Sequence, residues 1–422
     1  MNCRHCEAPA GAPQVSEVGL PSLTSPGSPG LSDSLMTEPE VTETTTASRQ
    51  RAPFNVPAVF MFLITTVPVL TLFPWYAWNY GFDAFEWIWF VVLCFVTGIS
   101  ITGGYHRFWA HRSYEASKPL QIFYMLFGAM SLQNSILIWA SMHRVHHRHV
   151  DDVENDPYSI KRGLWFAHMG WMLRDYPSGK VNTSNARDLE ANPIVMFQQR
   201  YYLWIAVGMN LGVPLLLGLW HGDVWGCLLL PGLLRLVVSH HVTFFINSLA
   251  HYWGRRPYTA ENTARDNDVL ALFTYGEGYH NFHHIFQWDY RNGVRWWQYD
   301  PTKWFIGLCS ALGLARGLRR VPEFQIRKAL VERQIERARE RVDACRDPGL
   351  LKRLQAQLEQ EASHLAELIS DWAALQQEKI EATKQKLLHQ WNESEAHRRL
   401  LAIEKSLRLQ QRRVRLIRLQ AA

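Results

Sequence analysis

The chain has 422 residues, a formal net charge of +6 and six cysteines. Hydrophobic residues make up 47% of it, yet its mean hydropathy is only -0.17, so strongly apolar stretches must alternate with polar segments. The eighteen tryptophans suit membrane interfaces, where amphipathic rings collect. Scattered cysteines exclude a disulfide-stapled fold. The diffuse positive charge suits anionic lipid and argues against nucleic acid as a partner.

The N-terminal region, residues 1–52, is rich in Ser, Thr, Pro, Gly and Glu and is predicted to be a disordered tail. It lacks the basic start and apolar core of a signal peptide. Cys3 and Cys6 flank His5, but a single Cys-x-x-Cys is a weak basis for a zinc site. Met36 begins Met-Thr-Glu-Pro-Glu and is a hypothetical alternative start, which mass spectrometry of the native N-terminus would test.

Four apolar stretches approach the roughly 20 residues that a membrane-spanning helix needs. They lie at about 56–73, 87–103, 201–220 and 225–246. A fifth stretch, Leu120 to Ala140, contains Gln133, Asn134 and Ser135, so we expect it at the interface or buried against the spans. Arg235 falls inside the fourth span, where a charge is costly and is usually paired or functional.

The connecting segments predict the orientation of the spans. Neither Pro74 to Glu86 nor His221 to Val224 contains Lys or Arg, whereas residues 107–200 and everything after Arg255 are rich in both. Because basic residues concentrate on the cytoplasmic side of membrane proteins, both termini are predicted to be cytoplasmic. The three histidine clusters described next would then share that side.

Eight histidines occur in three tight clusters. The clusters read His106-Arg-Phe-Trp-Ala-His111, His143-Arg-Val-His146-His147 and His280-Asn-Phe-His283-His284. Neutral imidazole is a ligand for iron, copper, nickel and zinc. Eight imidazoles exceed the needs of one closed tetrahedral site, so the sequence predicts two metal ions.

The spacing within the clusters suggests how they point. In His-x-x-His-His, positions i, i+3 and i+4 share one helix face, so one short helix could aim three imidazoles at a single centre. His106 and His111 are about 140° apart on an ideal helix, so they either straddle a helix end or bind different metals. Asn247 and His251 are four residues apart at the end of the fourth span. His251 is therefore a candidate ninth ligand, and Asn247 could reach a metal through water.

The chain changes character after Val321. Residues 323–346 are charged and helical in pattern, and Asp347-Pro-Gly349 is a turn signal. A short heptad series then follows: Leu351, Leu354, Leu358, Leu365, Leu368, Trp372 and Leu375. Two interpretations of 323–422 stay open, an amphipathic hairpin that folds on the rest of the chain and a coiled coil that forms a homo-oligomer. The basic end, Arg398 to Arg418, either lies on anionic lipid or presents a solvated helix face.

These motifs resemble the membrane-bound fatty acid desaturases, specifically the stearoyl-CoA desaturase-like delta-9 group of the type 1 family. The resemblance covers roughly residues 53–305. That group has a His-x-x-x-x-His box, a His-Arg-x-His-His box and a His-Asn-x-His-His box, and all three match here. Its Asn-Ser-x-Ala-His element matches residues 247–251.

The resemblance implies a site that holds two Fe ions through histidine. The ligands carried over are His106, His111, His143, His146, His147, His251, His280, His283 and His284, with Asn247 binding through water. The implied reaction uses O2 to remove two hydrogens from saturated C16–C18 acyl-CoA and leaves a cis delta-9 double bond. An acyl-lipid substrate and fatty acid hydroxylation are the alternatives. His149, His168, His240 and His241 are interpreted as non-ligands.

The family comparison also suggests substrate contacts and partners. Cys94 and Gly98 are small residues on the second span, where the family has the end of its acyl tunnel; ordinary helix packing is the alternative. Asn55 and the basic pair Lys161 and Arg162 are candidates for contact with CoA. No cytochrome b5 module is recognisable, so we expect a separate electron donor of the cytochrome b5, ferredoxin or reductase type.

The sequence therefore predicts an all-α integral membrane protein. Residues 53–322 would form a domain of four transmembrane helices whose cytoplasmic helical part holds the di-iron site. Residues 323–422 would form a C-terminal helical or coiled-coil extension.

Overall fold

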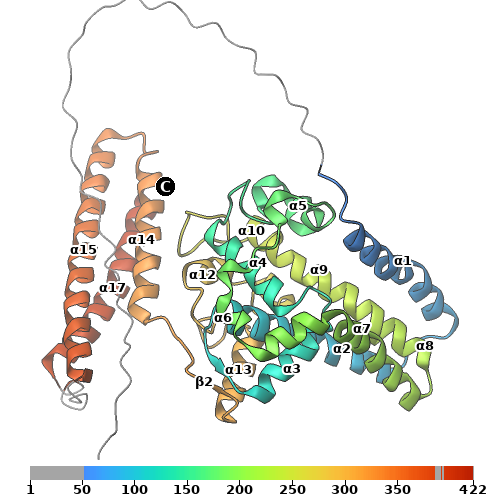
Figure 1. Ribbon diagram of the computed structural model, residues 1–422. Coiled ribbons are helices and arrows are strands. Elements are labelled where there is room, and N and C mark those ends of the chain that lie inside the picture. The colour runs from blue at the N-terminus through green and yellow to red at the C-terminus, as the bar shows by residue number, and fades with distance from the viewer. Residues whose placement is uncertain (1–51, 385–390, 392–393, 422) are drawn as a thin grey trace, which may run out of the picture. The chain divides into compact units, whose positions relative to one another are not determined.

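The computed structural model describes residues 52–384, 391 and 394–421 (Figure 1). Four continuous helices are long and apolar enough to cross a membrane: Val56–Asn79, Ala84–Ala110, Pro193–His221 and Val224–Tyr252. The predicted four spans are confirmed by this criterion, but each helix is longer than its apolar core. The extension arises because polar side chains cap the helices beyond the apolar residues; Asp83 and Asn192 cap the second and third.

The spans are built from these elements: α1 (Val56–Asn79), α2 (Ala84–Ile99) with the π-helical η1 (Ser100–Ala110), α7 (Pro193–His221), and α8 (Val224–Cys227), η6 (Leu228–Leu234), α9 (Arg235–Asn247) and α10 (Leu249–Tyr252). The remaining helices of residues 52–322 are α3 (Lys118–Ala129), α4 (Ile136–Arg148), α5 (Leu164–His168), α6 (Arg187–Glu190), α11 (Asp268–Phe273), α12 (His280–Ile285) and α13 (Pro301–Ala311). Short turns form η2 (Ile160–Arg162), η3 (Gly170–Met172), η4 (Pro177–Gly179) and η5 (Thr183–Asn185). Among the described residues, the strands are limited to β1 (Glu115–Ala116) and β2 (Ala315–Arg316), which pair antiparallel. The predicted all-α fold is confirmed.

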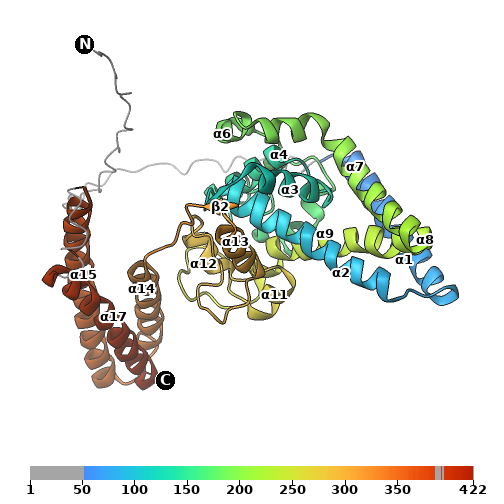
Figure 2. The same cartoon turned by 90° about the horizontal axis from the view of Figure 1, so that it is seen from below.

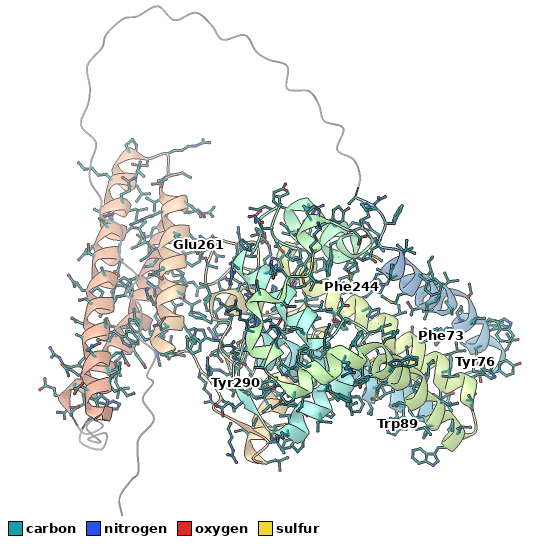
Figure 3. The ribbon with its side chains drawn as sticks, in the orientation of Figure 1. Phe73, Tyr76, Trp89, Phe244, Glu261 and Tyr290 are labelled. Atoms are coloured by element: carbon teal, nitrogen blue, oxygen red, sulfur yellow. The ribbon has the colours of Figure 1, made fainter. Side chains whose placement is uncertain are left out.

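Short loops join the spans at the end opposite the histidine clusters. Figure 3 shows Phe73, Tyr76 and Trp89 toward this end. The Tyr76 hydroxyl donates to Asp223 Oδ2 at 2.6 Å and so ties the first loop region to the second. His221 Nε2 lies 2.9 Å from Asp83 Oδ2 and makes a further link. These contacts keep the two helical hairpins together at the end away from the site.

The fifth apolar stretch forms two helices rather than one. It divides into α3 and α4 because Leu132 and Asn134 adopt positive φ angles of 51° and 75° and Ser135 caps α4. The Gln133 amide donates to Thr243 Oγ1 of α9 at 3.0 Å. The stretch is therefore bound against the spans through its polar interruption.

Arg235 is completely buried in the fourth span, and its partners are neutral. Its Nη2 donates to Asn210 Oδ1 at 2.6 Å and its Nη1 donates to the carbonyl of Met130 at 2.9 Å. Met130 is the C-terminal cap of α3, where free carbonyls carry partial negative charge. The guanidinium thus links α9 to α3 and α7.

Aromatic side chains packed on glycines hold η1 against α3. A β-carbon on Gly104 would lie 2.6 Å from Tyr124, and one on Gly128 would lie 2.3 Å from Tyr105. Both tyrosines are fully buried in one core cluster with Trp109. This close approach fixes the helical segment that carries His106.

The described residues of the C-terminal extension form a bundle of three helices. It consists of α14 (Glu323–Val342), α15 (Pro348–Lys384) and α17 (Glu395–Gln420), which lie side by side (Figure 2). The heptad leucines Leu354, Leu358, Leu365, Leu368 and Leu375 are buried in this bundle. Within the described residues, α17 contributes an apolar stripe of its own beside α14 and α15. The hairpin and the coiled-coil interpretations both stay predictions.

The helix α14 also packs against α12, which carries the third histidine cluster. Phe282 of α12 and Phe286, the residue that caps this helix, share one apolar cluster with Ile326 and Ala329 of α14. Arg337 Nη2 donates to the carbonyl of Arg256 at 2.6 Å. The extension thus supports α12 through the side of this helix that carries Phe282.

Replacing Ile326 by alanine should weaken this support. Because Ile326 is buried against α12, we expect Ile326→Ala to lower the free energy of unfolding by about 2–5 kcal/mol and to speed metal loss. Thermal unfolding and timed chelation of the purified protein would measure both. The exposed Lys352→Ala of α15 is the control. Identical behaviour of the two variants would contradict the supporting role.

Candidate metal centre

All nine histidines predicted as ligands come together in the structure, in two groups. The first group is His106, His111, His143, His147 and His283, and the second is His146, His251, His280 and His284. Within each group one nitrogen from every ring lies within 4.8 Å of all the others. The rings come from η1, α4, α10 and α12, which are far apart in the chain.

The Nε2 atoms within a group are spaced like ligands of one ion. His106 and His283 are 2.9 Å apart at these atoms, as are His111 and His143, and the His147–His283 distance is 3.1 Å. In the second group, His280 Nε2 lies 3.1 Å from Nε2 of both His251 and His284. Two nitrogens bound at right angles to a metal, each at about 2.1 Å, are about 3.0 Å apart. The spacing therefore fits two coordination sites.

The second and third clusters each divide between the two groups. On α4, His143 and His147 belong to the first group and His146 to the second. On α12, His283 belongs to the first group, and His280 and His284 belong to the second. The expectation that one short helix aims three imidazoles at one centre is therefore wrong. Residues i and i+4 project within about 40° of each other, while i+3 projects to the other side of i, so each helix points between two adjacent centres.

His106 and His111 belong to the same group. The sequence left open whether this pair straddles a helix end or binds different metals. The structure shows that the pair straddles a helix end, because η1 ends at Ala110 and His111 is its C-terminal cap. The His111 amide donates to the carbonyl of His106 at 3.0 Å, a five-residue bond of the π-helical kind. The wider turn brings residues five apart to one side, which an α-helix does not do.

Six of the clustered histidines outside the four spans are held neutral. Burial, reinforced by neighbouring imidazoles, lowers the pKa of His111, His143, His147, His283 and His284 well below the usual value. Burial likewise lowers the pKa of His280 to about 3. Neutral rings keep a free lone pair, which is the form that binds a metal.

Outer partners orient several of these rings through Nδ1. His106 Nδ1 lies 3.0 Å from Glu277 Oε2, and His146 Nδ1 lies 2.9 Å from Asp156 Oδ1. His251 Nδ1 lies 2.9 Å from Thr263 Oγ1, whose hydroxyl donates to Asp151 at 2.5 Å. Such carboxylate contacts select the tautomer whose Nε2 is free and raise its basicity.

Glu277 is itself held by Arg107. The Arg107 side chain is 1% exposed; its Nη2 donates to Glu277 Oε1 at 2.9 Å and its Nη1 to Asp300 Oδ2 at 3.1 Å. Burial alone would raise the pKa of Glu277, but His106 and Arg107 lower it to about 2. The carboxylate therefore stays ionised and can accept a hydrogen bond from His106.

Sequence reasoning missed these outer partners. Asp151 and Asp156 follow the second histidine cluster closely and Glu277 precedes the third, which is the available signal. Other acidic residues, such as Asp152 and Glu154, lie equally close to the second cluster, so proximity alone does not select the contacts.

A cavity of about 770 Å³ reaches the histidines. Its walls include Met61, Phe62, Ile101, Ile138, Met142 and Phe244, together with His106, His143, His280 and Asn247. Figure 3 shows Phe244 on α9. The exposed residues Asp175 and Lys180 and the start of α1 also line the cavity. The predicted water-mediated ligand, Asn247, thus shares a cavity with His280.

The predicted substrate residues fall in different places. Asn55 lines the cavity, but Cys94 and Gly98 do not. A β-carbon on Gly98 would lie 2.2 Å from the Tyr275 ring, whose hydroxyl donates to the carbonyl of Cys94 at 2.9 Å. The small residues therefore make room for an aromatic ring. Gly98 does line a smaller pocket that shares Ile101 with the large cavity.

The basic pair is also absent from the cavity wall. The Arg162 guanidinium lies 3.7 Å from the centre of the Phe166 ring. Arg174 and Lys180 line the cavity instead, and sequence reasoning did not select them. Neither Lys161 nor Arg162 is among the lining residues.

The histidines interpreted as non-ligands lie outside both groups. His168 contacts Ser248 Oγ and His241 Nδ1, each at 3.0 Å, and His240 Nε2 lies 2.9 Å from the carbonyl of Ser131. His240 is buried, whereas His168 and His241 are half-buried, and these contacts give their ring nitrogens hydrogen-bond partners.

Comparisons with known proteins agree with the geometry. Residues 85–311 match the model of the Fatty acid desaturase family. The chain belongs to the fatty acid desaturase family. The family match leaves out the three-helix bundle, as well as α1.

Individual relatives of this desaturase chain carry related names. It is 46% identical over 239 residues to a probable acyl-CoA desaturase of Schizosaccharomyces pombe, a stretch that is 56% of this chain and 50% of that protein. It is 38% identical to stearoyl-CoA desaturase 5 of Bos taurus, over 57% of this chain and 72% of the relative. It is also 38% identical to an acyl-CoA Delta12-desaturase of Acheta domesticus, over 56% and 68%. The chain thus spans about half the length of the yeast relative.

Replacing an outer carboxylate should weaken metal binding. We expect Glu277→Gln and Asp156→Asn each to lower metal affinity by about 10–100-fold, because a neutral amide stabilises the ligand tautomer less. Metal retained after timed chelation, measured by elemental analysis, checks this. Glu154→Gln is the matched control, since Glu154 is exposed beside Asp156. Equal retention in all three variants would show that the carboxylates do not tune the site.

Proposed function

We propose that this chain is an O2-dependent acyl-CoA desaturase that introduces a cis delta-9 double bond into saturated C16–C18 chains. The observation that carries the proposal is a largely apolar cavity whose lining includes members of both histidine groups. Membership of the fatty acid desaturase family and the names of the relatives support it.

The donor set fits two iron ions. Imidazole suits iron, and groups of five and four rings differ from the thiolate-rich, four-ligand sites typical of structural zinc. The two groups described above would hold one ion each, with Asn247 adding a water-mediated contact to the smaller group. Bound iron would supply the redox chemistry with O2 that an unactivated methylene requires.

The chain's own residues would position the substrate. Apolar walls from Ile101, Met142 and Phe244 suit an extended alkyl chain and exclude bulk water from the reacting carbons. His106 and His143 of the first group and His280 of the second line the same cavity, so bound methylenes would pass close to both groups. Positioning of this kind determines which carbons react.

The polar lining residues of the cavity near the start of α1 suit a charged headgroup. Asn55, Arg174 and Lys180 line it, and cationic and amide donors bind phosphate well. This supports CoA as the carrier. Lys161 and Arg162 stay as proposed surface contacts for CoA, and Cys94 and Gly98 as proposed contacts at the tunnel end.

We further propose that the site and both termini face the cytoplasm and that electrons come from a separate donor protein. The absence of Lys and Arg from the two short loops supports this sidedness. Oligomerisation through the C-terminal helices stays a hypothesis, and any such contact would have to use the outer faces of the bundle.

The proposed activity is tested by expression in a host that lacks its own desaturase. Fatty acid methyl esters would be separated by gas chromatography and their double bonds mapped by mass spectrometry. We expect new palmitoleate or oleate. His146→Ala and His283→Ala should lower product by more than about a hundredfold while the protein stays inserted, because each removes a ring from one group. His149→Ala is the control, since His149 lies outside both groups.

The products distinguish the alternatives. A gain of one oxygen in place of the loss of two hydrogens would indicate a hydroxylase. A double bond elsewhere would keep the family and reject delta-9, a real distinction because one relative is named a Delta12-desaturase. Product found first on membrane lipid would favour an acyl-lipid substrate, and full activity of His146→Ala would overturn the assignment of the site.

A further inference from the structure

The helix α17 has apolar residues on two opposite faces. Leu400, Ile403, Leu407, Val414 and Ile417 are buried in the three-helix bundle. Leu401, Leu409, Leu416 and Leu419 point the other way and are 52%, 46%, 58% and 56% exposed. Among the described residues of the bundle, Ile380 is the one other large aliphatic side chain in this exposure class. The exposed leucines are thus gathered on one face of one helix.

Cations fill the spaces between these leucines. Arg398, Lys405, Arg412 and Arg415 lie three or four residues from one of these leucines, and Arg408 lies two turns after Leu401. All five are exposed, so they share the outer face. The helix carries eight Lys and Arg against two acidic residues. Glu395 and Glu404 lie at the margins of the face. We call these four leucines and five cations the outer face of α17.

The other helices of the bundle do not have such a face. On α14, Arg327 pairs with Glu323, Lys328 with Glu332 and Arg333 with Glu336. On α17, Arg413 pairs with Glu361 of α15, but it lies to one side of the outer face. Within the described part of the chain, the five outer cations have no acidic partner. Their charge is therefore available to an anionic partner.

A second copy of the chain fits this face poorly. A symmetric dimer would bring the same cations of two helices together, and like charges at an interface oppose association. A purely apolar groove would leave the cations without counter-charges. An anionic bilayer surface offers phosphates for the cations and acyl chains for the interleaved leucines, which is the pattern of interfacial helices.

We propose that the outer face of α17 docks on anionic phospholipid of the membrane that contains the four spans. The bundle is covalently joined to those spans, so docking is an intramolecular event with a high effective concentration. The leucines would enter the boundary between headgroups and acyl chains, and the cations would bind phosphate and serine carboxylates. The proposal requires only that the chain is in a membrane and is independent of the desaturase activity.

The test uses the full-length chain in lipid nanodiscs. An environment-sensitive fluorescent amino acid replaces Leu409 on the outer face or, as a control, the exposed Gln360 of α15. Nanodiscs contain phosphatidylcholine alone or mixed with phosphatidylserine, each with brominated acyl chains that quench nearby fluorophores. We expect quenching at 409 to depend on phosphatidylserine and to weaken at high salt, with little quenching at 360.

Charge variants separate docking from folding. R408E/R412E should lower the docked-to-free ratio by at least about tenfold, while R408K/R412K should keep it. Both pairs lie on the exposed face, so circular dichroism should show unchanged helix content. Equal quenching at 409 and 360, or quenching without phosphatidylserine, would overturn the proposal. Shielding of 409 that rises with protein concentration in detergent would instead assign the face to a second copy.

Discussion

Crowding nine imidazoles into two adjacent groups is the constraint on which the rest of the structure depends. Rings whose Nε2 atoms lie 2.9–3.1 Å apart cannot be protonated together, because buried like charges repel strongly. Burial therefore keeps the rings neutral, and their converging lone pairs require a cation to be stable. The rest of the fold holds η1, α4, α10 and α12 in the positions at which their histidine rings converge.

Local irregularities in a helix, or contacts from residues outside the two groups, hold the histidine rings in place. The π-helical η1 brings His106 and His111 to one side, which regular α-helical geometry would not allow. Buried Arg107 keeps Glu277 ionised against the ring of His106. Behind α12, the apolar side chains of α14 complete a core that residues 53–322 leave open. The site thus depends on contacts that reach into the C-terminal bundle.

Much of the fold and site could be predicted because both are written in local patterns. Apolar stretches predict the spans, and the composition of each histidine cluster by itself predicts metal binding. The division of rings between two centres was mispredicted, since it depends on where neighbouring helices place the second centre. The role of Gly98 likewise depends on Tyr275, a residue far away in the chain that fills the adjacent space.

The sequence by itself determined the four spans, the nine candidate ligands and the membership of a helical membrane class, because residue type and short-range spacing carry that information. Only the tertiary structure decided which rings share a centre, which carboxylates support them, what lines the cavity and how the C-terminal leucines are used. Those features arise from contacts between segments distant in sequence, and such contacts are set by packing and electrostatics in three dimensions.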